Sequence, residues 1–168
     1  MTTLKALGPA CLYGAEPGLH EDAEMDALYR SYDHMLDICN RLESIADSLP
    51  AHIDALSCAA LAIELPDALQ RTHDEEERAL LPILSVSKLP ELRNVASRLR
   101  REHALDQVNA MEIRETLLAL ASNSLTLSGD AAGYQLRAFF ESLRRHVSAE
   151  QDILALLGHV PSSNGSVH

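Results

Sequence analysis

Apolar residues recur at spacings of three and four along most of the chain, and this period is typical of amphipathic helices. The pattern predicts helices over these approximate ranges: 21–47, 52–86, 90–121 and 134–157. Pro66 predicts a kink or break in the second helix, because proline removes an intrahelical hydrogen bond and clashes with the preceding turn. Pro82 is predicted to distort the last turn of the same helix for the same reason.

The predicted elements indicate an all-α fold, in which four helices pack into a bundle that can hold a metal site in its core. We predict a loose leader at residues 1–20, the bundle at 21–158 and a mobile tail at 159–168. Composition supports helices over sheet, since apolar residues make up 46% of the chain, aromatic residues only 4%, and Ala and Leu dominate. A length of 168 residues suits one domain with its own core.

The net charge of −11 argues against nucleic acid and anionic membranes as partners. No apolar run reaches the ~18–20 residues of a membrane span, and the N-terminus lacks the pattern of a secretory signal. The three cysteines, Cys11, Cys39 and Cys58, have no paired spacing, which indicates free thiols in a reducing compartment. We therefore predict a cytoplasmic protein.

Metal-ligand residue types lie on or beside the apolar faces of the predicted helices: His34, His73, Glu77, His103, His146 and Glu150. Two of the histidines carry a glutamate four residues downstream, and residues four apart share one face of a helix. Each His-x-x-x-Glu pair can therefore direct an imidazole and a carboxylate at one point. Two pairs and two single histidines supply six ligands, which is enough to hold two metal ions inside a bundle.

Burial and depth both favour ligation over ordinary packing. His146 and Glu150 fall within the apolar stripe of the fourth helix, where a carboxylate without a partner is costly. His73 precedes the turn near residues 88–90 by about 15 residues and His103 follows it by about 14, so the two are predicted to meet at one level. Of the acidic run that follows His73, we assign Glu75 and Glu76 to a solvated face and Glu77 to the core side.

This residue set resembles the hemerythrin-like, or HHE cation-binding, domain family. The family pattern matches His34, His73-x-x-x-Glu77, His103 and His146-x-x-x-Glu150, and residues 73–82 are similar to its second-helix signature. The resemblance covers about residues 22–158. It implies an up-down four-helix bundle around two non-heme irons, with Glu77 and Glu150 bridging the irons and the four histidines as terminal ligands.

The chain departs from the oxygen-carrying members of that family at one position. They place a fifth histidine one turn after the third-helix histidine, where this chain has Gln107. The candidates for that ligand position are water, Gln107, Asp106 and Asp74. The departure argues against reversible oxygen carriage and favours sensing, redox or nitric-oxide chemistry.

Two function classes follow. The first is a di-iron protein that binds or reacts with O2, NO or peroxide, in sensing, scavenging or an iron and redox stress role. The second is a metal-stabilised interaction or regulatory module without redox chemistry. Whether the protein is an enzyme is left open, and so is its oligomeric state, with a homodimer as one option. The Glu-x-x-His pairs of ferritin-like sites, a P-loop and a dinucleotide-binding motif are absent from the sequence.

Overall fold

The structure, a computed structural model, describes residues 17–124 and 126–158. Within these ranges it contains helices and no strand. The elements are α1 (Pro17–Ser48), α2 (Ala55–Glu75), η1 (Glu76–Leu80), α3 (Leu81–Ser85), α4 (Pro90–Ala121) and α5 (Gly129–Leu156). Because α2, the π-helical turn η1 and α3 follow one another without a break, they form a single helical arm.

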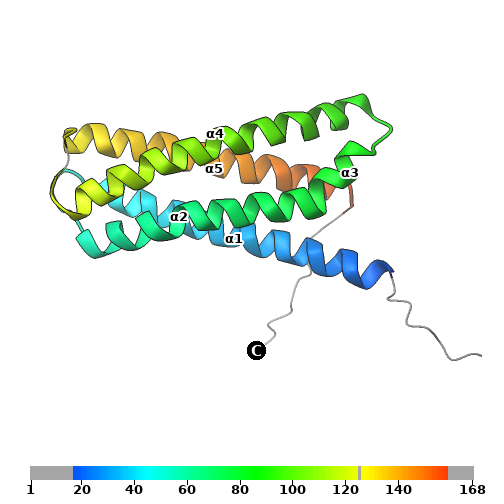
Figure 1. Cartoon of the computed structure of the whole chain (residues 1–168), viewed down its shortest axis with the longest axis horizontal. Helices are drawn as coiled ribbons and strands as arrows, with labels where there is room; N and C mark the ends of the chain where they lie inside the picture. The colour runs from blue at the N-terminus through cyan, green and yellow to red at the C-terminus, as the bar shows by residue number, and fades with distance from the viewer. Residues whose placement is uncertain (1–16, 125, 159–168) are drawn as a thin grey trace, which may run out of the picture.

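The four arms run alternately up and down and form a bundle (Figure 1). Each arm packs against two others: α1 lies beside α2 and α5, and α4 lies beside the same two helices. The predicted all-α, up-down four-helix bundle is therefore confirmed. No helix among the described residues is long and apolar enough to cross a membrane.

Side-chain caps fix where two of the helices begin. Asp54 accepts hydrogen bonds from the backbone N–H groups of Leu56 and Ser57, both at 3.1 Å, at the start of α2. Ser128 accepts one from Ala131 at the start of α5, also at 3.1 Å. The connection before α5 is therefore shorter than predicted. Residues 1–16 of the predicted leader lie outside the described residues, and residues 17–20 belong to α1 instead of a loose segment. The predicted tail lies outside the described residues.

The predicted break at Pro66 does not occur, since α2 is continuous from Ala55 to Glu75. A proline inside a helix costs about 3 kcal/mol. Its neighbours Leu65 and Leu69 are buried in the core, and burying one leucine side chain contributes roughly 1.5–3 kcal/mol. The free energy gained by packing this face is thus large enough to keep the helix continuous across the proline.

A distortion occurs near Pro82, but it lies before the proline, as η1, whereas the last turn, where it was predicted, is the regular helix α3. Pro82 has no N–H group to donate to the carbonyl of Arg78, so the regular hydrogen-bond ladder cannot continue there. At the residue before the proline, the N–H of Leu81 bonds to the carbonyl of Glu76, five residues back. This backbone bond joins Glu76 to Leu81, and both residues are fully buried.

Candidate metal centre

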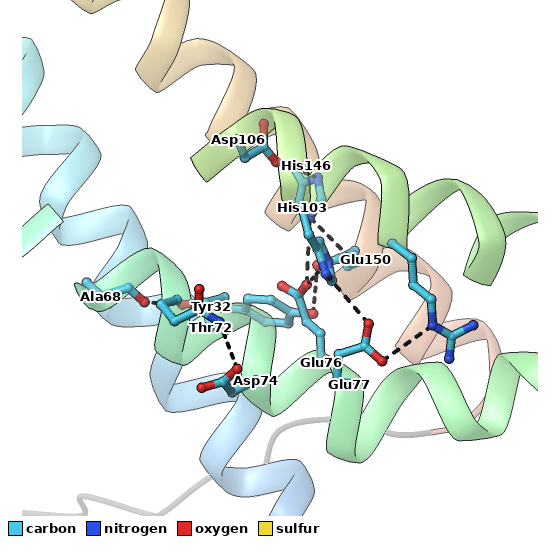
Figure 2. Close-up of polar contacts among 12 residues, drawn as sticks. Tyr32, Ala68, Thr72, Asp74, Glu76, Glu77, His103, Asp106, His146 and Glu150 are labelled. Atoms are coloured by element: carbon cyan, nitrogen blue, oxygen red, sulfur yellow. Dashed lines mark hydrogen bonds and ion pairs between the residues drawn. The ribbon is translucent and has the colours of Figure 1, made fainter. Parts of the chain in front are cut away.

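Four polar side chains converge in the core from three of the arms (Figure 2). Glu76 comes from η1, His103 from α4, and His146 and Glu150 from α5. One ligand atom of each lies within 4.8 Å of the ligand atoms of the other three. This set is called the His/Glu cluster below.

Glu76 is at the centre of the cluster. Its Oε2 lies 2.6 Å from His103 Nε2 and 3.9 Å from His146 Nε2. His146 Nε2 also lies 3.3 Å from Glu150 Oε1. Glu76 and Glu150 are 0% and 1% exposed, so these carboxylates are removed from water.

The close atoms are not aligned as hydrogen bonds. Among the described residues, both Glu76 oxygens, Nε2 of His103, Nε2 of His146 and Oε1 of Glu150 are buried and have no hydrogen-bond partner. Buried polar atoms without a partner are costly, and native proteins rarely leave several together. A cation among them would satisfy all of these atoms at once.

The electrostatics of the cluster favour a positive charge beside its carboxylates. Burial alone would lower the pKa of His146, but contacts with Glu150 and Glu76 outweigh it and raise the pKa to about 11. Burial would raise the pKa of Glu76, but His103 and His146 outweigh it and lower the pKa to about 2. At Glu150 burial prevails and raises the pKa to about 7. Two carboxylates that stabilise a proton on an imidazole can also stabilise a metal ion.

His73 lies directly beside the cluster. Its ring stacks on that of His103, with centroids 4.0 Å apart and planes 10° apart. The prediction that the two histidines meet at one level is therefore confirmed. Burial lowers the pKa of His73 to about 4, which leaves the imidazole neutral and able to ligate a metal.

The arm α1 contributes Tyr32 to the site. Its hydroxyl donates a hydrogen bond to Glu150 Oε2 at 2.9 Å, and the side chain is fully buried. Burial, followed by the nearby Glu150 and Glu76, raises the pKa of Tyr32, so the phenol keeps its proton. Tyr32 holds one oxygen of Glu150 while the other faces His146.

The structure does not bring His34 to the cluster. His34 Nε2 lies 3.3 Å from Glu64 Oε1 on α2, and its side chain is 42% exposed. Residues two apart on a helix point roughly 200° apart, so the buried Tyr32 directs His34 outward. In the sequence Tyr32 shares an apolar helix face with Leu28 and Met35, and a buried tyrosine hydroxyl normally has a partner. That signal could have identified it.

The acidic run is arranged differently from the prediction. Glu76, which we assigned to a solvated face, is fully buried, so that assignment is wrong. Glu77 lies at the rim with its side chain 44% exposed, 4.0 Å from His103 Nδ1 and 3.4 Å from Arg100 Nε. Spacings of three and of four both place a residue near His73 on the helix face. The rotation of α2 that buries Thr72 and His73 also buries Glu76, three residues after His73.

The candidates for the missing fifth ligand lie apart. Asp106 Oδ2 is 4.0 Å from His146 Nδ1 at the edge of the cluster. Gln107 donates to Gln70 Oε1 at 3.2 Å, and Asp74 accepts from Gln70 Nε2 at 2.9 Å, both on the outer surface. Asp106 therefore lies against a cluster residue, whereas Gln107 and Asp74 both bond to Gln70.

The donor set fits a transition metal. Two imidazoles and two carboxylates suit iron, manganese or zinc and do not suit calcium, which prefers oxygen ligands alone. The model of the hemerythrin HHE cation-binding domain matches residues 25–157. No curated protein and no solved structure gives a match to the chain. Since the matched segment reaches all four arms and includes the whole His/Glu cluster, the chain belongs to the hemerythrin HHE cation-binding domain family.

Proposed function

We propose that this protein holds iron at the His/Glu cluster and reacts there with O2, NO or peroxide. The observation that carries the proposal is the set of buried, unpartnered donor atoms on Glu76, His103, His146 and Glu150. Family membership supports cation binding by the same region. The choice of iron over other cations is part of the proposal.

A pair of iron ions is the form of the centre that we propose. Both oxygens of Glu76 are free of hydrogen bonds among the described residues, as a carboxylate shared between two ions requires. Glu76 then takes the bridging role expected for Glu77, alongside Glu150. His73 is the nearest additional imidazole, because its ring stacks on His103.

The protein's own residues would control the chemistry. Iron held by these residues in the ferrous state would supply electrons for the reaction with O2, NO or peroxide. Leu99 and Leu143 lie one turn before His103 and His146 and are 3% exposed, so they limit the access of water to the centre. Tyr32 fixes the orientation of Glu150 through its hydrogen bond.

The test compares two adjacent glutamates. Glu76→Gln and Glu77→Gln make the same chemical change one residue apart, at a buried and a half-exposed side chain. After expression with adequate iron, we expect Glu76→Gln to lose most of the metal and Glu77→Gln to keep it, by elemental analysis. Metal loss on Glu77→Gln alone would restore Glu77 as the ligand. Wild-type protein with under half an equivalent of iron would contradict the proposal itself.

A second candidate function is an interaction module in which the metal only stabilises the bundle. Leu105, Val108 and Met111 favour it, since they form an apolar row along α4 and are 63%, 58% and 46% exposed. Redox titration of iron-loaded protein separates the two functions. A centre that cycles between oxidised and reduced forms supports the reactive one, and a redox-silent centre supports the module.

A further inference from the structure

A pocket of about 300 Å³ lies between α2 and α4, on the outer side of the cluster. His73 and His103 line it, so two imidazoles of the site region face the pocket directly. Asp74 and Glu77 also line it and add two carboxylates. A cation that reached this pocket would meet acidic side chains first and imidazoles after them.

Two side-chain pairs cross from one helix to the other around this pocket. Gln107 Nε2 on α4 donates to Gln70 Oε1 on α2 at 3.2 Å. Arg100 Nε on α4 lies 3.4 Å from Glu77 Oε2 on the other arm. In Figure 2 a dashed line joins Glu77 to His103, whose Nδ1 lies 4.0 Å from Glu77 Oε1. All four side chains line the pocket, and both pairs are at the surface, where such contacts open easily.

His73 is the innermost residue that the two pairs cover. It is 4% exposed and stacks on His103. Among the described residues, none hydrogen-bonds or ion-pairs with its imidazole ring. An imidazole without such bonds can take a metal ion without first breaking a hydrogen bond or an ion pair.

We propose that the metal ion enters and leaves the His/Glu cluster through the α2–α4 pocket, with the Arg100–Glu77 and Gln70–Gln107 pairs as its gate. This inference rests on the proposed metal binding but concerns the rate of exchange. The expected cargo is a divalent cation, since the chain carries a net charge of −11 and the pocket presents two carboxylates and two imidazoles.

The competing route is a pocket of about 400 Å³ between α4 and α5. It is lined in part by Ile113, Phe139 and Leu143, and by none of the cluster histidines. Its nearest approach to the cluster is Asp106, 4.0 Å from His146 Nδ1. A metal ion sheds water in steps and needs strong ligands at each step. The α4–α5 pocket offers the carboxylates of Asp106 and Glu112 but no imidazole, so it is the poorer path.

Filling each pocket in turn distinguishes the routes. Ala104 lines the α2–α4 pocket and Ala138 lines the α4–α5 pocket, and both are exposed helix positions. Iron-loaded Ala104→Trp and Ala138→Trp are mixed with excess ferrous chelator, and the rate of colour formation gives the rate of metal loss. We expect Ala104→Trp to slow the loss several-fold and Ala138→Trp to match the wild type. Slowing by Ala138→Trp alone would overturn the proposal.

Opening the gate is the complementary measurement. Arg100→Gln removes the pair with Glu77, and we expect metal loss to become roughly two- to fivefold faster, the factor that an exposed ion pair supports. Arg98→Gln is the matched control, because Arg98 Nε lies 3.4 Å from Glu102 on its own helix. Equal rates for the two variants would refute the gate, even if Ala104→Trp fails to fold.

Metal content separates this inference from the proposed function. If the wild type and the variants bind equal iron at equilibrium and differ only in rate, both ideas stand. If they bind equal iron and all exchange it at the same rate, the proposed entry route is wrong but the proposed metal centre is supported. If none binds iron, both fall.

Discussion

The hydroxyl of Tyr32 on α1 donates a 2.9 Å hydrogen bond to Oε2 of Glu150 on α5. The two residues are 118 positions apart in sequence and both are buried. This bond ties the first helix to the carboxylate that faces His146 across 3.3 Å. It makes α1 part of the site although no α1 side chain belongs to the His/Glu cluster.

Replacing Tyr32 by Phe tests this tie. The change leaves Glu150 Oε2 buried without its donor, so we expect the free energy of unfolding to fall by about 1–3 kcal/mol. Urea denaturation of the metal-loaded protein measures it. Tyr134→Phe, at a 76% exposed position, is the control and should change stability by less than about 0.5 kcal/mol. Equal stability of the two variants would show that Glu150 has another donor.

His34 and His146 lead to opposite expectations for metal content. His146 lies between two buried carboxylates, whereas His34 pairs with Glu64 on the surface of α1 and α2. We expect His146→Ala to lose iron and His34→Ala to retain it, by elemental analysis of both proteins. Loss of iron in His34→Ala would mean that α1 turns on metal binding and brings His34 inward, as the family pattern implies.

Removing the metal is expected to destabilise the bundle. Without a cation the buried carboxylates of Glu76 and Glu150 lose a partner, and metal binding free energy contributes to folding. A free metal concentration of about 100 times Kd adds about 2.7 kcal/mol, which is roughly 5–10 °C in Tm for a chain of this size. Calorimetry of loaded and chelator-treated protein measures the shift. Glu76→Gln should show no shift, and an unchanged wild-type Tm would contradict the buried location of the site.

The side chain at position 107 bears on oxygen chemistry. Gln107 bonds to Gln70 and lines the α2–α4 pocket together with His73 and His103. A neutral amide is a weak iron ligand, so we expect the reduced protein to be oxidised by aerated buffer without recovery under vacuum. Stopped-flow absorbance follows this reaction.

Two variants at the same position refine the measurement. Gln107→His places an imidazole in the α2–α4 pocket beside His73 and His103, and we expect oxidation to slow. Gln107→Leu removes the amide without adding a ligand and should react like the wild type. Oxygen uptake that reverses under vacuum in the wild type would restore a carrier role.

The sequence by itself determined the helices and the kind of chemistry. The spacing of apolar residues predicted four helical arms, and α4 begins and ends where the pattern placed it, at Pro90 and Ala121. His103, His146 and Glu150 were identified because polar residues stood within apolar stripes. These features are local, so helical periodicity was enough to reveal them.

Tertiary structure decided which of several neighbouring residues face the core. Successive helix residues point about 100° apart, so a change of one residue in helix register exchanges Glu77 for Glu76. The rotation of α2 in the bundle makes that exchange, because it buries Thr72, His73 and Glu76 together and leaves Glu77 at the rim. On α1, packing buried Tyr32 and left His34 at the surface. Periodicity finds the buried face of a helix, but only packing against the other arms fixes the rotation at which each side chain enters the core.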